Sequence, residues 1–217
     1  MQKSSTKQLY NYWNSLRGTR SAPDRKSIDP TRIRDCLAYT FILETDGDES
    51  YAFRLAGSHL CSAYCREIKS RAFNDIWHEK DRDAIATLLR AVTDDHAVAL
   101  TTFSGKTSIG TSAKFEMALM PLLHNGASNV RVLGSMTVIE EPYWLGVQPI
   151  VEQRISGLRL IWPDAINETF DVSGESTGVS DLTWREASGG GIATSGLENG
   201  ARRRYAHLTV IDGGRNS

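Results

Sequence analysis

The sequence of 217 residues has few cysteines, no long apolar run and no apolar core in its N-terminal segment MQKSSTKQLY. The three cysteines, Cys36, Cys61 and Cys65, are an odd number, which favours a reducing compartment over a disulfide framework. No apolar run approaches the roughly 18 residues that a membrane-spanning helix needs, and a secretory signal would need an apolar core. We therefore expect a cytoplasmic protein without a membrane span.

Two motifs of catalytic or nucleotide-binding proteins are absent or incomplete. No Gly-x-Ser-x-Gly elbow stands between a predicted strand and a predicted helix, as in serine hydrolases; the one run of this pattern, at 174–178, lies in the acidic stretch rich in Gly, Ser and Thr. The run SGKT at Ser104–Thr107 resembles the end of a phosphate-binding loop, but Leu100 stands where the first glycine would be needed. The residues that follow alternate as in a strand, so we expect a hairpin turn there and no nucleotide site.

Cys61 and Cys65 would share one face of a helix and could supply two thiolates to a metal, with His59 nearby. A closed tetrahedral site needs four ligands, and no second pair of cysteines or histidines lies close in the sequence. We therefore expect these cysteines to be small buried apolar groups, with no metal site.

The charge is unevenly distributed along the chain. Net charge is −1, whereas residues 1–36 carry +5 (eight Lys or Arg, three Asp) and residues 163–200 carry −6 (one Arg, seven Asp or Glu). A net charge near zero does not favour a nucleic-acid partner, although binding through the basic N-terminus stays a weaker alternative that predicts steep salt dependence. The acidic stretch is rich in Gly, Ser and Thr without a period, so we predict that residues 142–217 form a mostly flexible tail. Folding of the tail back onto the basic end is the alternative.

The N-terminal residues 1–36 predict an amphipathic helix and a basic loop. Leu9, Tyr12, Trp13 and Leu16 recur at helical spacing and form one apolar stripe, which Gly18 can end. Beyond the basic loop, Asp29 can cap a second helical segment that begins at Pro30. We expect the stripe to cover the outer face of a sheet or to pair with a second subunit, which makes these four residues a candidate dimer or partner interface. The same packing argues against bases stacking on Tyr12 and Trp13.

Residues 37–141 predict an α+β domain. A period of two indicates strands from Leu37 to Leu43 and from Tyr51 to Leu55, joined by a hairpin loop with Asp-Gly, and further strands at 97–103, 112–123 and 129–141. Short helical pieces fill residues 58–80, and an amphipathic helix begins at Asp81. We expect one five-stranded antiparallel sheet with helices on one face, because neither strand group alone buries a core.

Two charged residues in the predicted strands could have roles of their own. Glu116 lies among apolar residues and could be a perturbed carboxylate, but by alternation it shares a face with Lys114. We expect an ion pair on the solvent side. Arg54 could bind an anionic ligand, but alternation places it opposite Tyr51 and Phe53, so we expect it to pair with an acid on the outer face.

Five segments in this order carry a resemblance to PAS domains, and to small single-PAS regulatory proteins of alphaproteobacteria. They are YNYWNSLRGTRSAPDR, IDPTRIR, YAFRLAGSHLC, NDIWHEKDR and RRRYAHLTVIDGGR. The resemblance implies a PAS fold and a cytoplasmic regulator of cell-cycle or motility signalling, without enzymatic activity. The implied partners are a second copy or signalling proteins such as sensor kinases. Cys65 stands where the family pattern has Gly.

A PAS fold would place a ligand between the inner face of the sheet and the helices. The candidate pocket residues are all apolar: Phe41, Leu43, Phe53, Trp77, Leu88, Phe115, Met117, Leu119 and Met136. They suit a small apolar ligand or a filled core, and we expect no cofactor. Some PAS domains carry haem, but we expect none here, because His78 lies among charged residues and His96 follows two acids at a helix end. A small hydrolase or isomerase is the alternative, and it would need titratable groups inside the pocket.

Overall fold

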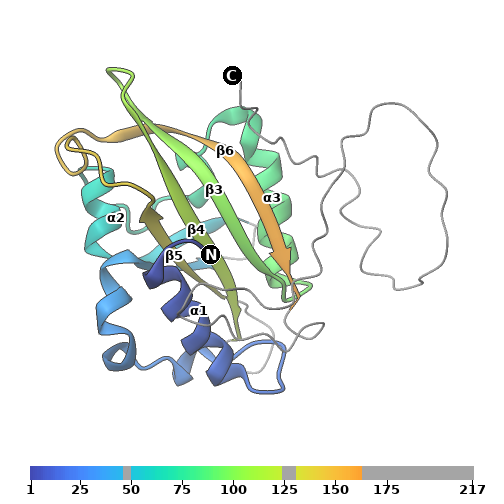
Figure 1. The fold of residues 1–217 in the computed structure, drawn as a ribbon. Coiled ribbons are helices and arrows are strands. Elements are labelled where there is room, and N and C mark those ends of the chain that lie inside the picture. Colours follow the sequence, from blue (N-terminus) through green and yellow to red (C-terminus); the bar gives the residue numbers. More distant parts are fainter. Residues whose placement is uncertain (46–49, 124–130, 163–217) are drawn as a thin grey trace, which may run out of the picture.

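The computed structural model describes residues 1–45, 50–123 and 131–162 (Figure 1). The helical elements are α1 (Ser4–Arg17), the 3-10 helices η1 (Arg25–Ser27) and η2 (Pro30–Tyr39), α2 (Ser58–Ala63), the 3-10 helix η3 (Phe73–Ile76) and α3 (Glu79–Thr93). The strands are β1 (Thr40–Thr45), β2 (Tyr51–Ala56), β3 (Val98–Thr107), β4 (Ser112–Leu122), β5 (Arg131–Val138) and β6 (Ile150–Ile161).

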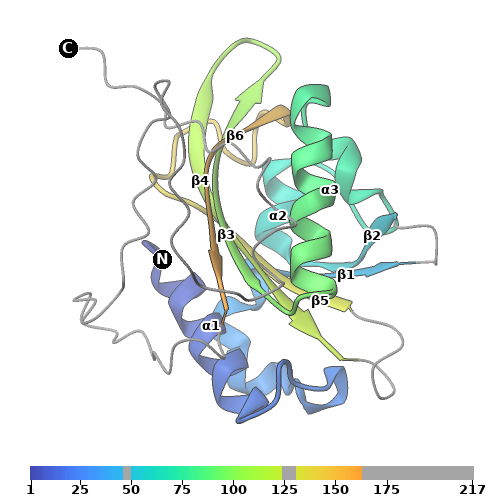
Figure 2. The same cartoon turned by 90° about the vertical axis from the view of Figure 1, so that its right-hand side faces the viewer.

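The strands form one sheet in the order β2-β1-β5-β4-β3-β6, and every pair of neighbours is antiparallel. Figure 2 shows this sheet between α1 on one side and α2 and α3 on the other. The predicted antiparallel α+β sheet is confirmed. We call the side covered by α1 the outer face and the side covered by α2 and α3 the inner face.

The sheet has six strands where the sequence predicted five. The additional strand, β6, lies at the edge beside β3, within the segment predicted as a tail from residue 142. Its period of two is broken where the pairing with β3 shifts register between Thr102 and Phe103, opposite Gly157. Such an irregularity displaces the alternation by one residue, which hides the strand in the sequence. The residues predicted as a tail beyond 162, and the Asp-Gly turn at 46–49, lie outside the described residues.

Element boundaries differ from the predictions at two places. Residues 37–39, predicted as strand, continue the 3-10 helix η2, which starts after Asp29 as predicted; the Asp29 side chain accepts a hydrogen bond from the backbone N–H of Thr31. Helix α3 begins one turn before the predicted cap at Asp81. The Nδ1 of His78 caps it by accepting a hydrogen bond from the backbone N–H of Lys80.

Helix α1 covers the outer face as the sequence predicted. Its stripe packs on apolar side chains of the central strands, including Ala118, Met120 and Leu133. The indole of Trp13 is fully buried, and its N–H donates to the carbonyl of Pro121 at 2.8 Å. Burying a Trp contributes most when its polar N–H is also satisfied, so this residue fixes the position of α1 on the sheet.

Candidate functional site

The nine predicted pocket residues lie together in one buried cluster between the inner face and the helices. Each is at most 5% exposed. Six of them lie on β1, β2 and β4, and Met136 lies on β5. Leu88 comes from α3, and Trp77 directly follows η3. The structure therefore brings together the set that the sequence assigned to a PAS interior.

Aromatic rings fill much of this interior. A continuous series of contacts runs from Phe41 through Phe73, Trp77 and Phe103 to Phe115, with ring centroids 5.1 to 6.0 Å apart. Edge-to-face and offset-stacked pairs at these separations are the favoured arrangements of buried rings. Phe103 and Phe73 were missing from the predicted set, although both are large apolar residues.

A glycine on β5 makes room for one end of this series. A Cβ at Gly134 would lie 2.1 Å from Cζ of Phe41, so the ring rests directly on the glycine backbone. Real Cβ atoms do not approach other atoms so closely, so a larger residue here would displace the ring. The ring and the backbone are thus in direct contact, with no space between them for a ligand.

Two surface hollows, of about 530 and 360 Å³, involve none of the nine predicted residues. The larger one has a mixed lining that includes Lys114, Glu140 and Ile139, and the smaller one has a mainly polar lining that includes Gln8 and His59. The larger hollow lies by β3, the start of β4 and the residues after β5, and the smaller one lies beside the start of α1. No ring of the aromatic series lines either hollow.

A buried polar pair lies inside the core, where the sequence predicted only apolar groups. The amide of Gln153 on β6 donates a hydrogen bond to the hydroxyl of Tyr64 next to α2, and both side chains are buried. Gly105 lies opposite Gln153 on β3. Burial raises the pKa of the Tyr64 hydroxyl above its ordinary value, because the charged form would be desolvated. Sequence reasoning missed this pair because Gln153 was assigned to the tail.

Two polar atoms near this pair have no hydrogen-bond partner within the described part of the chain. They are Oε1 of Gln153 and the indole N–H of Trp77. A buried unpaired group costs roughly 1–3 kcal/mol of stability. The interior therefore offers one acceptor and one donor among its apolar walls, and neither group titrates near neutral pH.

The candidate interface residues on α1 are largely used within the chain itself. Leu9 and Trp13 are fully buried on the outer face, and Tyr12 is 8% exposed. Leu16 is half-buried against the same cluster. In this arrangement the stripe is a contact between α1 and the sheet, so a partner could reach it only if α1 left the sheet.

The prediction for Glu116 is wrong. Its side chain is 1% exposed and makes no ion pair with Lys114; instead it accepts hydrogen bonds from the backbone N–H groups of Gln2, at 2.5 Å, and Lys3, at 3.1 Å. Lys3 also donates from Nζ to the carbonyl of Ile139, and Ser5 bonds to Thr137. Alternation placed Glu116 on the outer face correctly, but the start of α1 covers that face. Glu116 therefore fixes the first residues of the chain to β4.

The other candidates resolve as structural residues or surface groups. Arg54 is exposed and pairs with Glu44 at 3.3 Å, as predicted. Cys61 is half-buried and Cys65 is exposed, so the expectation of two buried cysteines is wrong. Cys65 has a φ of 50°, in the left-handed region that glycine favours, which gives a reason for the glycine of the family pattern at this position.

The described residues contain no group of three or more His, Cys, Asp or Glu side chains that could hold a metal ion. Ser104–Thr107 lies in β3 and not in the turn, and no helix follows it, so it is not a phosphate-binding loop. No helix among the described residues is long and apolar enough to cross a membrane.

Three comparisons with known proteins were made. A solved structure titled "Flavin Analogue Sheds Light on Light-Oxygen-Voltage Domain Mechanism" resembles the chain with a TM-score of 0.42 and 10% identity, covering 52% of this chain and 85% of its own. A search of curated proteins found no match. A family model described as PAS domain matches residues 1–137, which include α1 and extend through most of β5. The chain therefore belongs to the PAS domain family, whose members are typically sensory or regulatory modules of signalling.

Proposed function

We propose that this protein is a non-enzymatic PAS regulator that acts through its surface, by docking on signalling proteins or by dimerisation, in cell-cycle or motility control. The observation that supports it is the aromatic series from Phe41 to Phe115, which occupies the interior with the protein's own rings. A hydrolase or isomerase would need titratable groups together in a pocket. Tyr64 is the polar group nearest to that role, and burial raises its pKa away from neutrality.

The surface that best fits docking lies where β3 ends and β6 begins. Four large apolar side chains are exposed there: Ile109, Tyr143, Val147 and Val151 are 60–88% exposed. Thr107 pairs with Ile150, which brings the β3–β4 turn beside the start of β6. Single exposed apolar residues are ordinary, but several at one end of a sheet are typical of protein contact sites.

Native mass spectrometry of the full chain tests this proposal, since it gives the subunit count and any retained small molecule together. We expect a dimer that carries no small molecule. The double substitution Val147→Asp and Val151→Asp should then shift the mass to the monomer. A dimer that persists in this variant would exclude this surface as the dimer interface. The candidate residues Leu9, Tyr12, Trp13 and Leu16 of α1 would then be the next to test. A stoichiometric small molecule would overturn the filled interior.

A second candidate function, a sensor of a small ligand, is favoured by one specific observation. Gln153 Oε1 and the Trp77 indole N–H are buried without a partner in the described part of the chain. A small, mainly apolar molecule with one donor and one acceptor could satisfy both groups, provided the rings shift to admit it. Such a ligand would appear in the same mass spectrum and should be lost from a Gln153→Leu variant that keeps its fold.

A further inference from the structure

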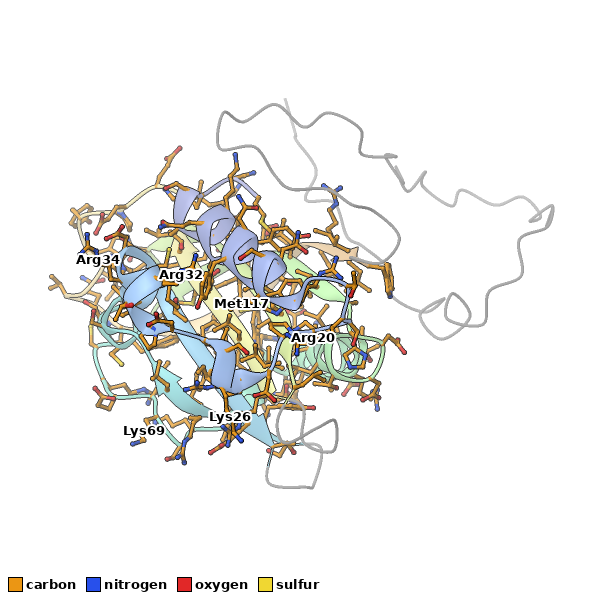
Figure 3. The ribbon with its side chains drawn as sticks, turned by 90° about the horizontal axis from the view of Figure 1, so that it is seen from below. Arg20, Lys26, Arg32, Arg34, Lys69 and Met117 are labelled. Atoms are coloured by element: carbon orange, nitrogen blue, oxygen red, sulfur yellow. The ribbon has the colours of Figure 1, made fainter. Side chains whose placement is uncertain are left out.

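Five basic side chains lie on one end of the molecule, which Figure 3 shows from below. They are Arg20 from the loop after α1, Lys26 from η1, Arg32 and Arg34 from η2, and Lys69 from the connection between α2 and η3. All five are exposed. We call this set the basic face. Four of the five come from residues 20–34, and the fold adds Lys69 from a distant segment.

The segment between α1 and β1, which carries four of the five residues of the basic face, is held firmly against the rest of the fold. The backbone N–H of Arg25 donates to the carbonyl of Leu123 at 2.8 Å, and the N–H of Leu123 donates to the carbonyl of Pro23 at 2.9 Å. The hydroxyl of Tyr12 accepts from the backbone N–H of Asp29 at 2.8 Å. These bonds join the segment to the end of β4 and to α1. The basic side chains therefore project from an ordered frame, which lowers the entropy cost of binding a partner.

The charges on the basic face are held in position and only partly neutralised. The guanidinium of Arg32 lies over the ring of Tyr12, 5.6 Å from its centre, and Arg20 donates to the carbonyl of Leu16 at 3.1 Å. Among the described residues, Arg34 is the member of the face with a carboxylate partner, Asp35, at 3.7 Å with both side chains highly exposed. An exposed pair of this kind contributes little. Asp24, Asp29 and Asp35 lie on the same segment, and Asp29 interacts electrostatically with Arg32. Residues 18–36 hold five Lys or Arg against three Asp, so the face keeps a surplus of positive charge for an anionic partner.

The same chain contains a segment with the complementary charge. Residues 163–200 carry −6, and they begin two residues beyond Ile161, the end of β6. Ile161 packs against the apolar cluster between α1 and the outer face of the sheet. That cluster also includes Ala22 and Ile28, which belong to the loop after α1. The acidic segment is thus attached close to the basic face, and a short tether gives effective concentrations in the millimolar range.

We propose that the acidic segment at 163–200 binds the basic face of its own chain. This inference goes beyond the proposed function, because it assigns a specific occupant to the basic face. The proposed docking surface with Ile109, Tyr143, Val147 and Val151 is a different one. An anionic partner that uses the basic face would have to displace the segment, so the contact is autoinhibitory.

Zero-length carbodiimide cross-linking of the full chain tests the contact, because it joins a lysine amine to a carboxylate only when the two touch. We expect cross-links from Lys26 and Lys69 to carboxylates of residues 163–200, in protein that migrates as a monomer. Lys80 and Lys106 lie at the opposite end of the sheet and serve as internal controls without such cross-links. The yield should fall by roughly threefold or more between about 0.05 and 0.5 M NaCl, because salt screens the attraction.

Two matched variants decide which basic group holds the segment. Replacing Arg20, Arg32 and Arg34 by Gln keeps both reporter lysines and should lower the cross-link yield by a similar factor. Replacing the three arginines at 202–204 by Gln removes the same charge elsewhere and should leave the yield unchanged. Equal yields at both salt concentrations, a loss only in the 202–204 variant, or cross-links found only between two chains would each overturn the proposal. Circular dichroism melting curves check that both variants are folded.

Discussion

Glu116 gives the most specific prediction about how the N-terminal helix is held. Its carboxylate is buried on the outer face and accepts two backbone hydrogen bonds, from Gln2 and Lys3. Lys3 is the N-cap residue of α1, and its N–H has no partner within the helix. The carboxylate from β4 therefore does for α1 what a capping side chain within the helix usually does.

The magnitude follows from these two bonds. A hydrogen bond to a charged group contributes roughly 1.5–3 kcal/mol, and a donor left buried without a partner is costly. Glu116→Ala removes both acceptors and should lower the free energy of unfolding by about 3 kcal/mol. Glu116→Gln keeps one oxygen of similar position but removes the charge, so it should cost about 1–2 kcal/mol.

Urea denaturation and hydrogen exchange measured by mass spectrometry check both values. In Glu116→Ala, amides of α1 should exchange faster than amides of β3 and β4, because the helix loses its anchor while the inner core is intact. Glu140→Gln removes an exposed carboxylate and serves as the control, with a change within about 0.5 kcal/mol. An unchanged stability of Glu116→Gln, together with unchanged exchange in α1, would refute the reasoning.

Three further predictions concern the inner face. Burial raises the pKa of Tyr64, so the folded state holds this proton more tightly than the unfolded state does; its contribution to stability is complete below the ordinary pKa of about 10 and is lost as pH rises above it. Urea denaturation at pH 8 and near pH 11 should therefore show a smaller alkaline loss in Tyr64→Phe than in the unmodified protein, and equal losses would contradict this. Gly134→Ala forces the Phe41 ring away from the sheet and should cost about 2–3 kcal/mol, with a smaller cost in a Phe41→Leu background; additive costs would exclude the ring contact as the cause. Tyr64→Phe alone leaves a polar partner unsatisfied and should cost about 1–2 kcal/mol, whereas Tyr64→Phe with Gln153→Leu should cost less than the sum of the single variants in a double-mutant cycle.

The periodicity of the sequence was sufficient to predict which face most side chains occupy. The stripe from Leu9 to Leu16 indicated a helix with one apolar side, and alternation in the strand at 112–123 separated Phe115 and Met117 from Glu116. Periodicity says nothing about what covers each face. Glu116 was therefore assigned to solvent, although Gln2 and Lys3, which bind its carboxylate, lie 114 and 113 residues earlier in the chain.

Two other features could not be predicted because long-range pairing determines them. Strand β6 exists because β3 offers a free edge, and its register shift opposite Gly157 removes the alternation that would have marked it. Gln153 is a core residue only once that strand is in place. A polar residue between Glu152 and Arg154 gives no local signal of burial, since its partner Tyr64 lies 89 residues away.

The use of α1 within its own chain limits how it could serve as an interface. For the stripe to reach a second copy, α1 must leave the outer face, which breaks the Trp13 bond to Pro121 and the two bonds to Glu116. It also exposes Leu9 and the indole of Trp13, and loss of such a large buried side chain typically costs about 3–5 kcal/mol. An exchange of α1 between two copies would restore these contacts, whereas docking of the stripe on an unrelated partner would have to replace them. Dimerisation through α1 is therefore compatible with this fold only as an exchange of the whole helix, including its contacts with Glu116, so Glu116→Ala should weaken such a dimer as well as the monomer.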